Sequence, residues 1–137
     1  NDIRQAAADA VAAEIAAAGG QAIANSDDIT RIDSAQRIVD AAVAAYGEVH
    51  VVVNNAGILR DKSFAKMDMA DFRLVVDVHL MGAANCCKAV WPHMQAQNYG
   101  RIVSVTENSI QLRELIQDAS GDWVEKMTNL DLQEGKK

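Results

Sequence analysis

The sequence has few aromatic residues, few cysteines and a single proline, and each shortage limits what the chain can be. Phe, Trp and Tyr make up 4% of the 137 residues, so the core has to be built from aliphatic side chains and methionine. The two cysteines, Cys86 and Cys87, are adjacent within a helical pattern, and we expect packed thiols rather than a structural disulfide. Reduced thiols favour a reducing, cytoplasmic setting.

Positive charge and long apolar runs are also scarce. Lys and Arg number 13 against 19 Asp and Glu, which gives a formal net charge of -6 and no basic face for nucleic acid. No uncharged apolar run approaches the roughly 20 residues of a membrane-spanning helix, and the first residues lack a signal-peptide pattern. We therefore expect one domain with a single core, and neither nucleic acid nor a membrane as partner.

Three stretches have helical periodicity. Residues 3–18 repeat apolar positions four apart and end at two glycines, which are typical of a helix C-terminus. Residues 34–46 form a second amphipathic stretch that ends at Gly47. Residues 71–97 carry a broad apolar face and predict one long helix.

Strand-like stretches separate these helices. Residues 21–25 are a short strand candidate, whereas residues 49–53 and 100–105 are apolar, β-branched runs typical of strands covered on both faces. The alternation of helix and strand predicts an α/β fold, with a parallel sheet and helices on both of its faces.

The composition changes after Thr106, and the sequence divides there into residues 1–106, an α/β domain, and residues 107–137, an atypical tail. The tail is polar and contains no further valine-rich run. We expect one amphipathic helix in it, built on Ile110, Leu112, Leu115 and Ile116.

Ligands of an open parallel sheet bind outside the carboxyl ends of its strands. Three strand ends are expected, at residues 25–28, 54–57 and 105–108, and in neighbouring strands they would line one crevice. The strand 49–53 ends abruptly in Asn-Asn-Ala-Gly, where amides can hold an irregular turn and Gly57 lets a ligand approach the main chain. Alone, this stretch is as compatible with an ordinary turn as with a cofactor crevice.

Three segments closely resemble the short-chain dehydrogenase/reductase family: "YGEVHVVVNNAGILRDKSFAKM", "DFRLVVDVHLMGAANCCKAVWPHM" and "YGRIVSVT". The forms "NNAGILRD", "VHLMG" and "WPHM" are similar to the hydroxyacyl-CoA dehydrogenase branch found in multifunctional β-oxidation enzymes. The resemblance covers about residues 2–106. It implies a partial Rossmann-type doubly wound parallel sheet, NAD as cofactor, and hydride transfer to or from a secondary alcohol such as a 3-hydroxyacyl-CoA.

The resemblance also implies site residues, each with a plainer alternative. Asp28 matches the acid that bonds the adenine amino group, and it is equally suited to capping the following helix. Asp2 matches the acid that accepts the ribose hydroxyls and repels a 2′-phosphate, although a terminal carboxylate is often merely solvated. His79 stands where many members use a helix Asn to hold a water, and it is equally suited to a structural role. The family's cofactor-side turn corresponds to Asn54, Asn55, Ala56 and Gly57.

The family's catalytic set is where the sequence departs from the pattern. A phenol with a nearby ammonium acts as acid and base beside the carbonyl, and the family supplies Ser, then Tyr and Lys four residues apart. Here Glu107 stands at the serine position, and Ser109 is a displaced candidate. Lys126 is preceded four residues earlier by Asp122, a carboxylate that is ionised at neutral pH. The glycine-rich fingerprint for the pyrophosphate is not found in this sequence either.

Two functions remain open from the sequence. The first is an oxidoreductase of this family whose sequence is incomplete or altered, so that this chain is inactive alone. The second is a non-catalytic Rossmann remnant that serves as a binding or oligomerisation module, and helix 71–97 would make the contact in a homo-oligomer. An unrelated flavodoxin-like module is the weakest alternative, because the Asn-Asn-Ala-Gly and Tyr-Gly-Arg-Ile-Val contexts coincide.

Overall fold

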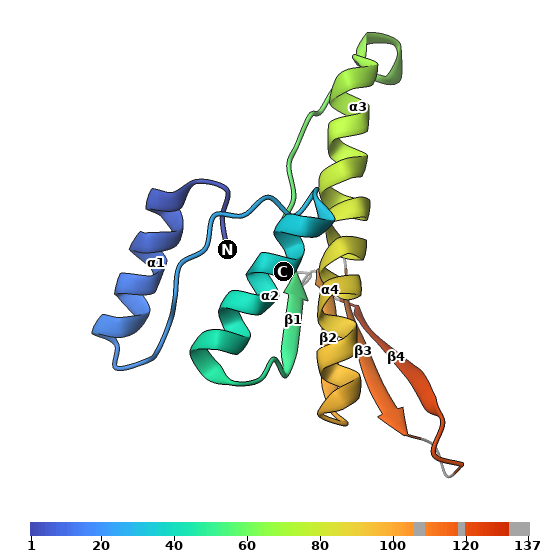
Figure 1. Cartoon of the computed structure of the whole chain (residues 1–137). Coiled ribbons are helices and arrows are strands. Elements are labelled where there is room, and N and C mark those ends of the chain that lie inside the picture. The colour runs from blue at the N-terminus through green and yellow to red at the C-terminus, as the bar shows by residue number, and fades with distance from the viewer. Residues whose placement is uncertain (106–108, 118–119, 132–137) are drawn as a thin grey trace, which may run out of the picture.

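The computed structural model describes residues 1–105, 109–117 and 120–131, and Figure 1 shows how the elements are arranged. Within these ranges the chain forms four α-helices, a short 3₁₀ turn and one π-helical segment. Their bounds are α1 (Gln5–Ala17), α2 (Ile32–Tyr46), η1 (Phe64–Lys66), α3 (Met69–Val76), η2 (Asp77–Met81) and α4 (Gly82–Ala96).

One sheet contains the four described strands, in the order β1-β2-β3-β4. Their bounds are β1 (Val51–Asn54), β2 (Gly100–Val105), β3 (Ser109–Gln117) and β4 (Trp123–Asp131). β1 and β2 are parallel, with Val52 opposite Ile102, whereas β3 pairs antiparallel with β2 and with β4. The predicted α/β class and the parallel pairing of the two valine-rich strands are confirmed, and an antiparallel hairpin extends the sheet.

The core lies between α2, α4 and one face of β1 and β2. These elements alternate small and branched aliphatic side chains, so the helices approach the sheet closely, as the shortage of aromatic residues predicts. Both cysteines are free and pack against this core, as expected. The fully or almost fully buried members are Ala35, Val39, Ala89, Val90, Met94 and Ile102.

The predicted helix 71–97 is confirmed as one rod in Figure 1, made of α3, η2 and α4 in succession. Asp68 begins it as an N-cap, since its carboxylate accepts a hydrogen bond from the backbone N–H of Ala70 at 2.8 Å. The π-helical segment widens the rod in the middle, at residues 77–81. Such π-bulges occur frequently at functional sites.

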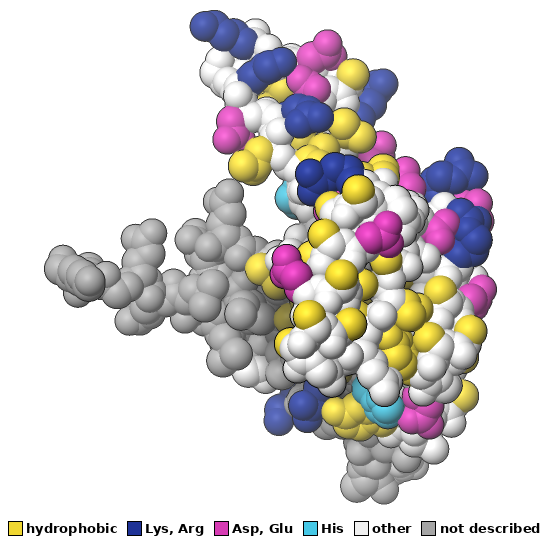
Figure 2. Space-filling model, turned by 90° about the vertical axis from the view of Figure 1, so that its left-hand side faces the viewer, with side chains coloured by type: hydrophobic (Ala, Val, Ile, Leu, Met, Phe, Trp, Pro, Cys, Tyr) yellow, Lys and Arg dark blue, Asp and Glu magenta, His cyan; other side chains and the backbone are white. Residues whose placement is uncertain are grey.

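The second face of the parallel pair is open among the described residues. Val51 and Val53 point away from the core and are 48% and 57% exposed. Figure 2 shows further apolar side chains lying between charged ones on the α1 side of the molecule. Within the described part, the expected helices on both faces are therefore seen on one face only. No described helix has the length and apolar character needed to cross a bilayer.

Two predicted elements are wrong. Residues 21–25 are not a strand, because none of the described strands runs alongside them, and they contact the chain start instead, where Asn25 C=O accepts from Asp2 N–H. The tail 107–137 is not helical in its described residues, since β3 and β4 occupy them. The free edge of β2 offers backbone partners to β3, and such pairing overrides a weak helical pattern.

Candidate functional site

The corner of the chain at the carboxyl end of β1, Asn54–Gly57, is the first part of the site. Asn54 is the last strand residue and is half-buried, whereas Asn55, Ala56 and Gly57 are exposed. The N–H of Asn55 donates to the C=O of Val53 at 3.1 Å, which turns the chain sharply away from the sheet. The corner therefore presents backbone and amide groups at the edge where parallel sheets bind ligands.

His79, in the π-helical segment, holds the far side of this corner. Its Nε2 lies 3.0 Å from the backbone N of Ile58 and 2.9 Å from the Ile58 carbonyl oxygen. A ring nitrogen accepts from the N–H when it is unprotonated and donates to the C=O when it carries the proton. A Cβ at Gly57 would come within 2.6 Å of His79 Cε1, so glycine is what lets the imidazole lie against the main chain.

The first turn of α4 holds a second segment, the turn before α2. Asn85 Nδ2 donates to the Ile29 C=O at 3.0 Å, and a Cβ at Gly82 would meet Ile29 Cδ1 at 2.6 Å. Within the turn before α2, Asp28 Oδ1 accepts from the backbone N–H of Thr30 at 2.9 Å. Asp28 thus stabilises the turn before α2 but does not cap the helix, whose N-cap is Arg31 without a side-chain hydrogen bond, and a role toward adenine stays a prediction.

Asp2 lies on the short segment that precedes α1, and its carboxylate forms an ion pair with Arg4. Arg4 Nε and Nη2 lie 3.2 and 3.1 Å from the two carboxylate oxygens, and the Arg4 backbone N–H donates to Oδ1 at 2.8 Å. Hydrogen bonding to Arg4 lowers the pKa of Asp2 below its ordinary value. The carboxylate is therefore ionised at neutral pH, and hydroxyl ligands would have to compete with the guanidinium.

An ion pair connects residues 25–28 to α2. Arg37 lies 2.6 Å from Asp27 Oδ1 and also donates to the buried Ser34 Oγ at 2.7 Å. Hydrogen bonds from Asn25 and then from Arg37 lower the pKa of Asp27. Asn1 Nδ2 donates to the Asp27 carbonyl at 3.1 Å, so the chain start is fixed on the same segment.

These contacts bring three predicted site segments into one array. Asp2 is joined to residues 25–28, those residues continue into the turn held by α4, and α4 with η2 holds the Asn54–Gly57 corner. Figure 1 shows the N-terminus, the start of α2 and the tip of β1 on the same side of the long helix. Residues 106–108, part of the third expected strand end, lie outside the described residues.

The two candidate catalytic residues are not brought together. Ser109 begins β3, which places its backbone at the carboxyl end of β2, near the corner. Lys126 is exposed on β4 opposite Glu114, and Glu114 pairs with Arg101 near the amino end of β2. Five strand residues separate the two rows, a distance of roughly 17 Å. The register does not support a joint role, and a role for either residue stays a prediction.

Both tyrosines lie at the end of the sheet away from the corner. Tyr46 is the last residue of α2, and Tyr99 directly precedes β2. The Tyr99 ring meets His50 edge-on at 5.6 Å and lies under the Arg101 guanidinium at 5.7 Å. These contacts give Tyr99 a packing role at the amino ends of the strands.

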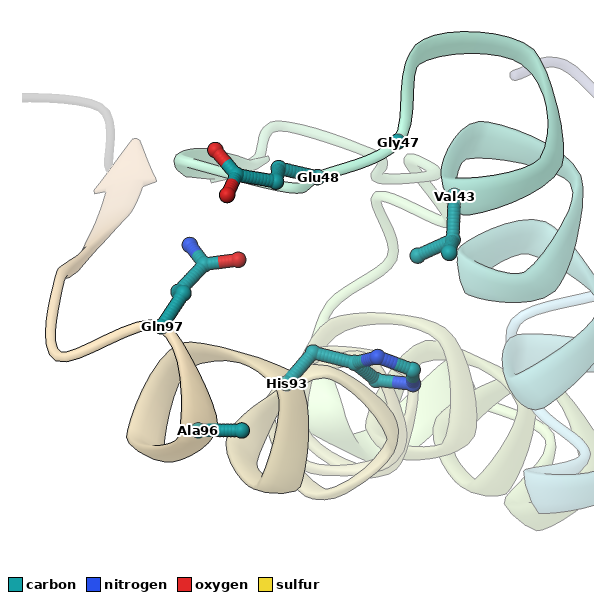
Figure 3. A pocket seen from close by; sticks show the side chains of 6 residues that line it. All are labelled: Val43, Gly47, Glu48, His93, Ala96 and Gln97. Carbon is teal, nitrogen blue, oxygen red and sulfur yellow. The ribbon is translucent and has the colours of Figure 1, made fainter.

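Two surface hollows differ in their relation to this array. One of about 300 Å³, shown in Figure 3, lies at the amino end of β1 with Glu48, His93 and Gln97 around it. Gln97 bonds the Val49 C=O at 2.7 Å there, which braces the chain entering β1. The other, about 340 Å³, is lined by Ile58, His79 and side chains of α3, and charged residues of the 60–62 loop also border it. Position relative to the strand ends favours the second hollow as the functional one.

Sequence reasoning missed two residues that position the site, Asn85 and Cys87. Asn54 Nδ2 donates to Cys87 Sγ at 3.4 Å, and Asn85 bonds Ile29 as described. The signal that could have identified Asn85 was a polar amide next to the apolar face of the predicted helix. The partners of both residues are more than 30 positions distant in the sequence, so periodicity cannot identify them.

The chemistry of the array suits part of a dinucleotide. Carboxylates and amides accept from ribose hydroxyls and an adenine amino group, and the open corner admits a ring against the main chain. The sequence holds no glycine-rich turn to supply backbone amides for a pyrophosphate. Over the described ranges, no group of three or more His, Cys, Asp or Glu side chains is arranged to hold a metal ion.

Known proteins match most of the chain. The family model described as short chain dehydrogenase matches residues 1–117. The peroxisomal multifunctional enzyme type 2 of Drosophila melanogaster is 48% identical over 105 residues, 77% of this chain and 17% of that protein. The peroxisomal hydratase-dehydrogenase-epimerase of Saccharomyces cerevisiae is 48% identical over 98 residues, 72% of this chain and 11% of that protein.

A third relative and a solved structure are similar over the same region. A 3-oxoacyl-[acyl-carrier-protein] reductase of Synechocystis is 40% identical over 100 residues, 73% of this chain and 40% of that protein. A 7α-hydroxysteroid dehydrogenase, solved with NADH and 7-oxo glycochenodeoxycholic acid, has a TM-score of 0.71 and 36% identity, covering 77% of this chain and 41% of that one. The chain thus spans less than half the length of each.

Proposed function

Because the chain belongs to the short-chain dehydrogenase family, we propose that it forms the cofactor side of an oxidoreductase that transfers hydride between NAD and a secondary alcohol. The observation that carries this proposal is the long helix, which holds the Asp28 turn and the Asn54–Gly57 corner at one edge of the sheet. A nicotinamide cofactor supplies the hydride chemistry when bound. The residues of this chain position it.

NAD rather than NADP is the proposed cofactor. Asp2 would accept the ribose hydroxyls, Asp28 the adenine amino group, and the Asn54–Gly57 corner would face the nicotinamide side. The Asp2 carboxylate is ionised at neutral pH, and its negative charge would repel a 2′-phosphate. Arg4 opposes this preference because its guanidinium neutralises the same carboxylate.

The proposed substrate is a 3-hydroxyacyl-CoA. The fruit fly relative is a peroxisomal multifunctional enzyme, the yeast relative is a peroxisomal hydratase-dehydrogenase-epimerase, and the Synechocystis relative is a 3-oxoacyl-[acyl-carrier-protein] reductase. The hollow beside Ile58 and His79 is lined by both apolar and charged side chains, which supports a substrate with an apolar chain and a charged group. We propose a reducing, cytoplasmic setting from the free thiols, while two of the named relatives are peroxisomal proteins.

We propose further that this polypeptide has no turnover by itself. Reduction of a carbonyl needs a proton donor beside it, and neither tyrosine reaches the corner: both lie at the opposite end of the sheet. Ser109 and Lys126 are the remaining candidates, and the register separates them. We therefore expect this chain to bind the cofactor without turning over a substrate.

Fluorescence titration with NADH and NADPH, paired with a turnover assay, tests the proposal. We expect the 137-residue chain to bind NADH in preference to NADPH, and to form no NADH from NAD and a 3-hydroxyacyl-CoA. Arg4→Ala should strengthen the preference for NADH by freeing the Asp2 carboxylate. Arg73→Ala is the matched control, since Arg73 is exposed on α3 and lies outside the array. Equal affinity for both cofactors in the wild type and in Arg4→Ala would remove the case for NAD.

A second function, self-association through the long helix, is favoured by its exposed apolar side chains. Leu80 is 64% exposed on the π-helical segment. Phe72, Leu74 and Met81 of the same rod are also exposed. Exposed apolar patches of this kind are typical of interaction sites, and an assembly built on this helix is compatible with either catalytic or non-catalytic use.

A further inference from the structure

The side chain of Asn54 has a sulfur partner that joins the corner to the long helix. Asn54 Nδ2 donates to Cys87 Sγ at 3.4 Å, between the last residue of β1 and the second turn of α4. Both residues are half-buried, which shields the contact from most of the competing water. This is a direct side-chain link between the cofactor-side turn and the helix that carries the rest of the array.

The neighbouring thiol provides a contrast within the same helix. Cys86 and Cys87 are both free, both half-buried and both packed against the core. Burial raises the pKa of the Cys86 thiol. Successive residues of a helix point in directions about 100° apart, so the two sulfurs meet different surroundings. Among the described residues, the Asn54 amide is bonded by Cys87 and not by Cys86.

We propose that Cys87 is a positioning residue for the cofactor corner, because its sulfur favours one orientation of the Asn54 carboxamide. The consequence for cofactor affinity rests on the proposed function, whereas the consequence for the corner itself does not. One amide hydrogen is directed at the sulfur, which leaves the second N–H and the carbonyl oxygen of Asn54 in a defined orientation. The Asn54 side chain therefore has a preferred orientation at the point where the corner begins.

The sulfur suits this role because it is a weak acceptor. A weak bond biases the amide toward one orientation without preventing small adjustments when a ligand arrives. A serine at this position would bring a stronger oxygen acceptor, which also bonds to its own helix backbone. We therefore expect the serine variant to keep part of the contact and the alanine variant to lose it.

Nuclear magnetic resonance of the labelled full chain without any cofactor tests the positioning role. The readouts are the side-chain amide of Asn54 and the backbone amides of Asn55, Ala56 and Gly57. Cys87→Ala should shift these resonances and speed exchange of the Asn54 amide hydrogens, and Cys87→Ser should remain closer to the wild type. Cys86→Ala, which removes the same atom from the same helix turn, should leave them unchanged. Unshifted corner resonances in Cys87→Ala, or equal shifts in Cys86→Ala, would overturn the proposal.

NADH titration of the same variants separates this inference from the proposed function. Loss of one hydrogen bond that orients a ligand-facing group should weaken binding by about two- to tenfold in Cys87→Ala and not in Cys86→Ala. Equal affinity in the two variants would overturn a role of Cys87 in cofactor binding. A wild-type chain that does not bind NADH would contradict the proposed function alone, because the resonances of the corner decide the positioning role independently.

Discussion

The contact between Gly57 and His79 leaves no room for a side chain at the end of the corner. A Cβ at Gly57 would lie 2.6 Å from His79 Cε1, so Gly57→Ala should push the imidazole away from Ile58. Overpacking of this kind costs about 1–3 kcal/mol, which urea denaturation measures. His79→Ala makes space, and the double variant should be less destabilised than the sum of the two single variants. Additive effects would show that the two residues do not meet in solution.

The ion pair of Asp27 with Arg37 predicts an acid-sensitive contribution to stability. The pKa of Asp27 is lower in the folded chain than in the unfolded chain, because Asn25 and Arg37 bond its ionised form. The contribution is therefore present at neutral pH and is lost as the pH falls through the folded-state pKa. Thermal unfolding followed from neutral to acidic pH should show a shallower decline in Asp27→Asn than in the wild type.

Asp40 provides the control for that measurement, because Asp33 of the same helix itself pairs with Arg37. Asp40 is exposed on α2, the helix that carries Arg37, and accepts from the neutral Gln36 amide at 2.9 Å. Asp40→Asn should leave the acid decline of the melting temperature close to that of the wild type. An identical slope in the wild type and in Asp27→Asn would contradict a role for the ion pair.

Single residues of the site were predictable only where a strand ended or a family pattern applied. The Asn54–Gly57 corner could be located from the sequence because a valine run stops there. Two helix residues hold this corner: His79 bonds Ile58, and Cys87 bonds Asn54. Both contacts depend on how a helix distant in the sequence lies over the strand. No local pattern contains that information.

At the scale of elements, α4 is the helix on which both the core and the site depend. Met94 is fully buried, and a Cβ at Gly100 would collide with its side chain, so helix and strand are tightly packed there. Met94→Ala should destabilise the fold by about 2–5 kcal/mol, measured by urea denaturation. Met81→Ala, on the exposed surface of the same rod, should change stability by less than about 0.5 kcal/mol. Equal losses of stability in the two variants would show that the core is not centred on Met94.

Elements were predictable where their periodicity was strong, and not where pairing decides. The three helical stretches and the two valine-rich strands appear as expected. Residues 21–25 lack a strand neighbour among the described residues. In the tail, Ile110 and Leu112 alternate as in a strand, while Leu112, Leu115 and Ile116 fit a helix. Gly121 lies between β3 and β4 with a φ of 84°, and this glycine was a possible turn signal that the expected helix did not take into account.

For the molecule as a whole, exposed apolar surface predicts self-association. Leu80 lies on the outside of the long helix, and light scattering at tens of micromolar should give a mass above that of one chain. Leu80→Gln should shift the population toward the monomer, because it removes apolar area from the contact. Lys88→Gln, an exposed substitution further along the rod, is the control. A monomeric wild-type mass would contradict the proposed contact.

The central claim is that the corner after β1 and the turn before α2 form one nucleotide-holding site. Chemical-shift mapping of the wild-type chain during titration with NADH tests it most directly. The account predicts shifts concentrated at Asp2, Asp28 and the Asn54–Gly57 corner, with none around the hollow at Glu48 and His93. Shifts confined to that hollow, or no shifts at saturating NADH, would contradict it.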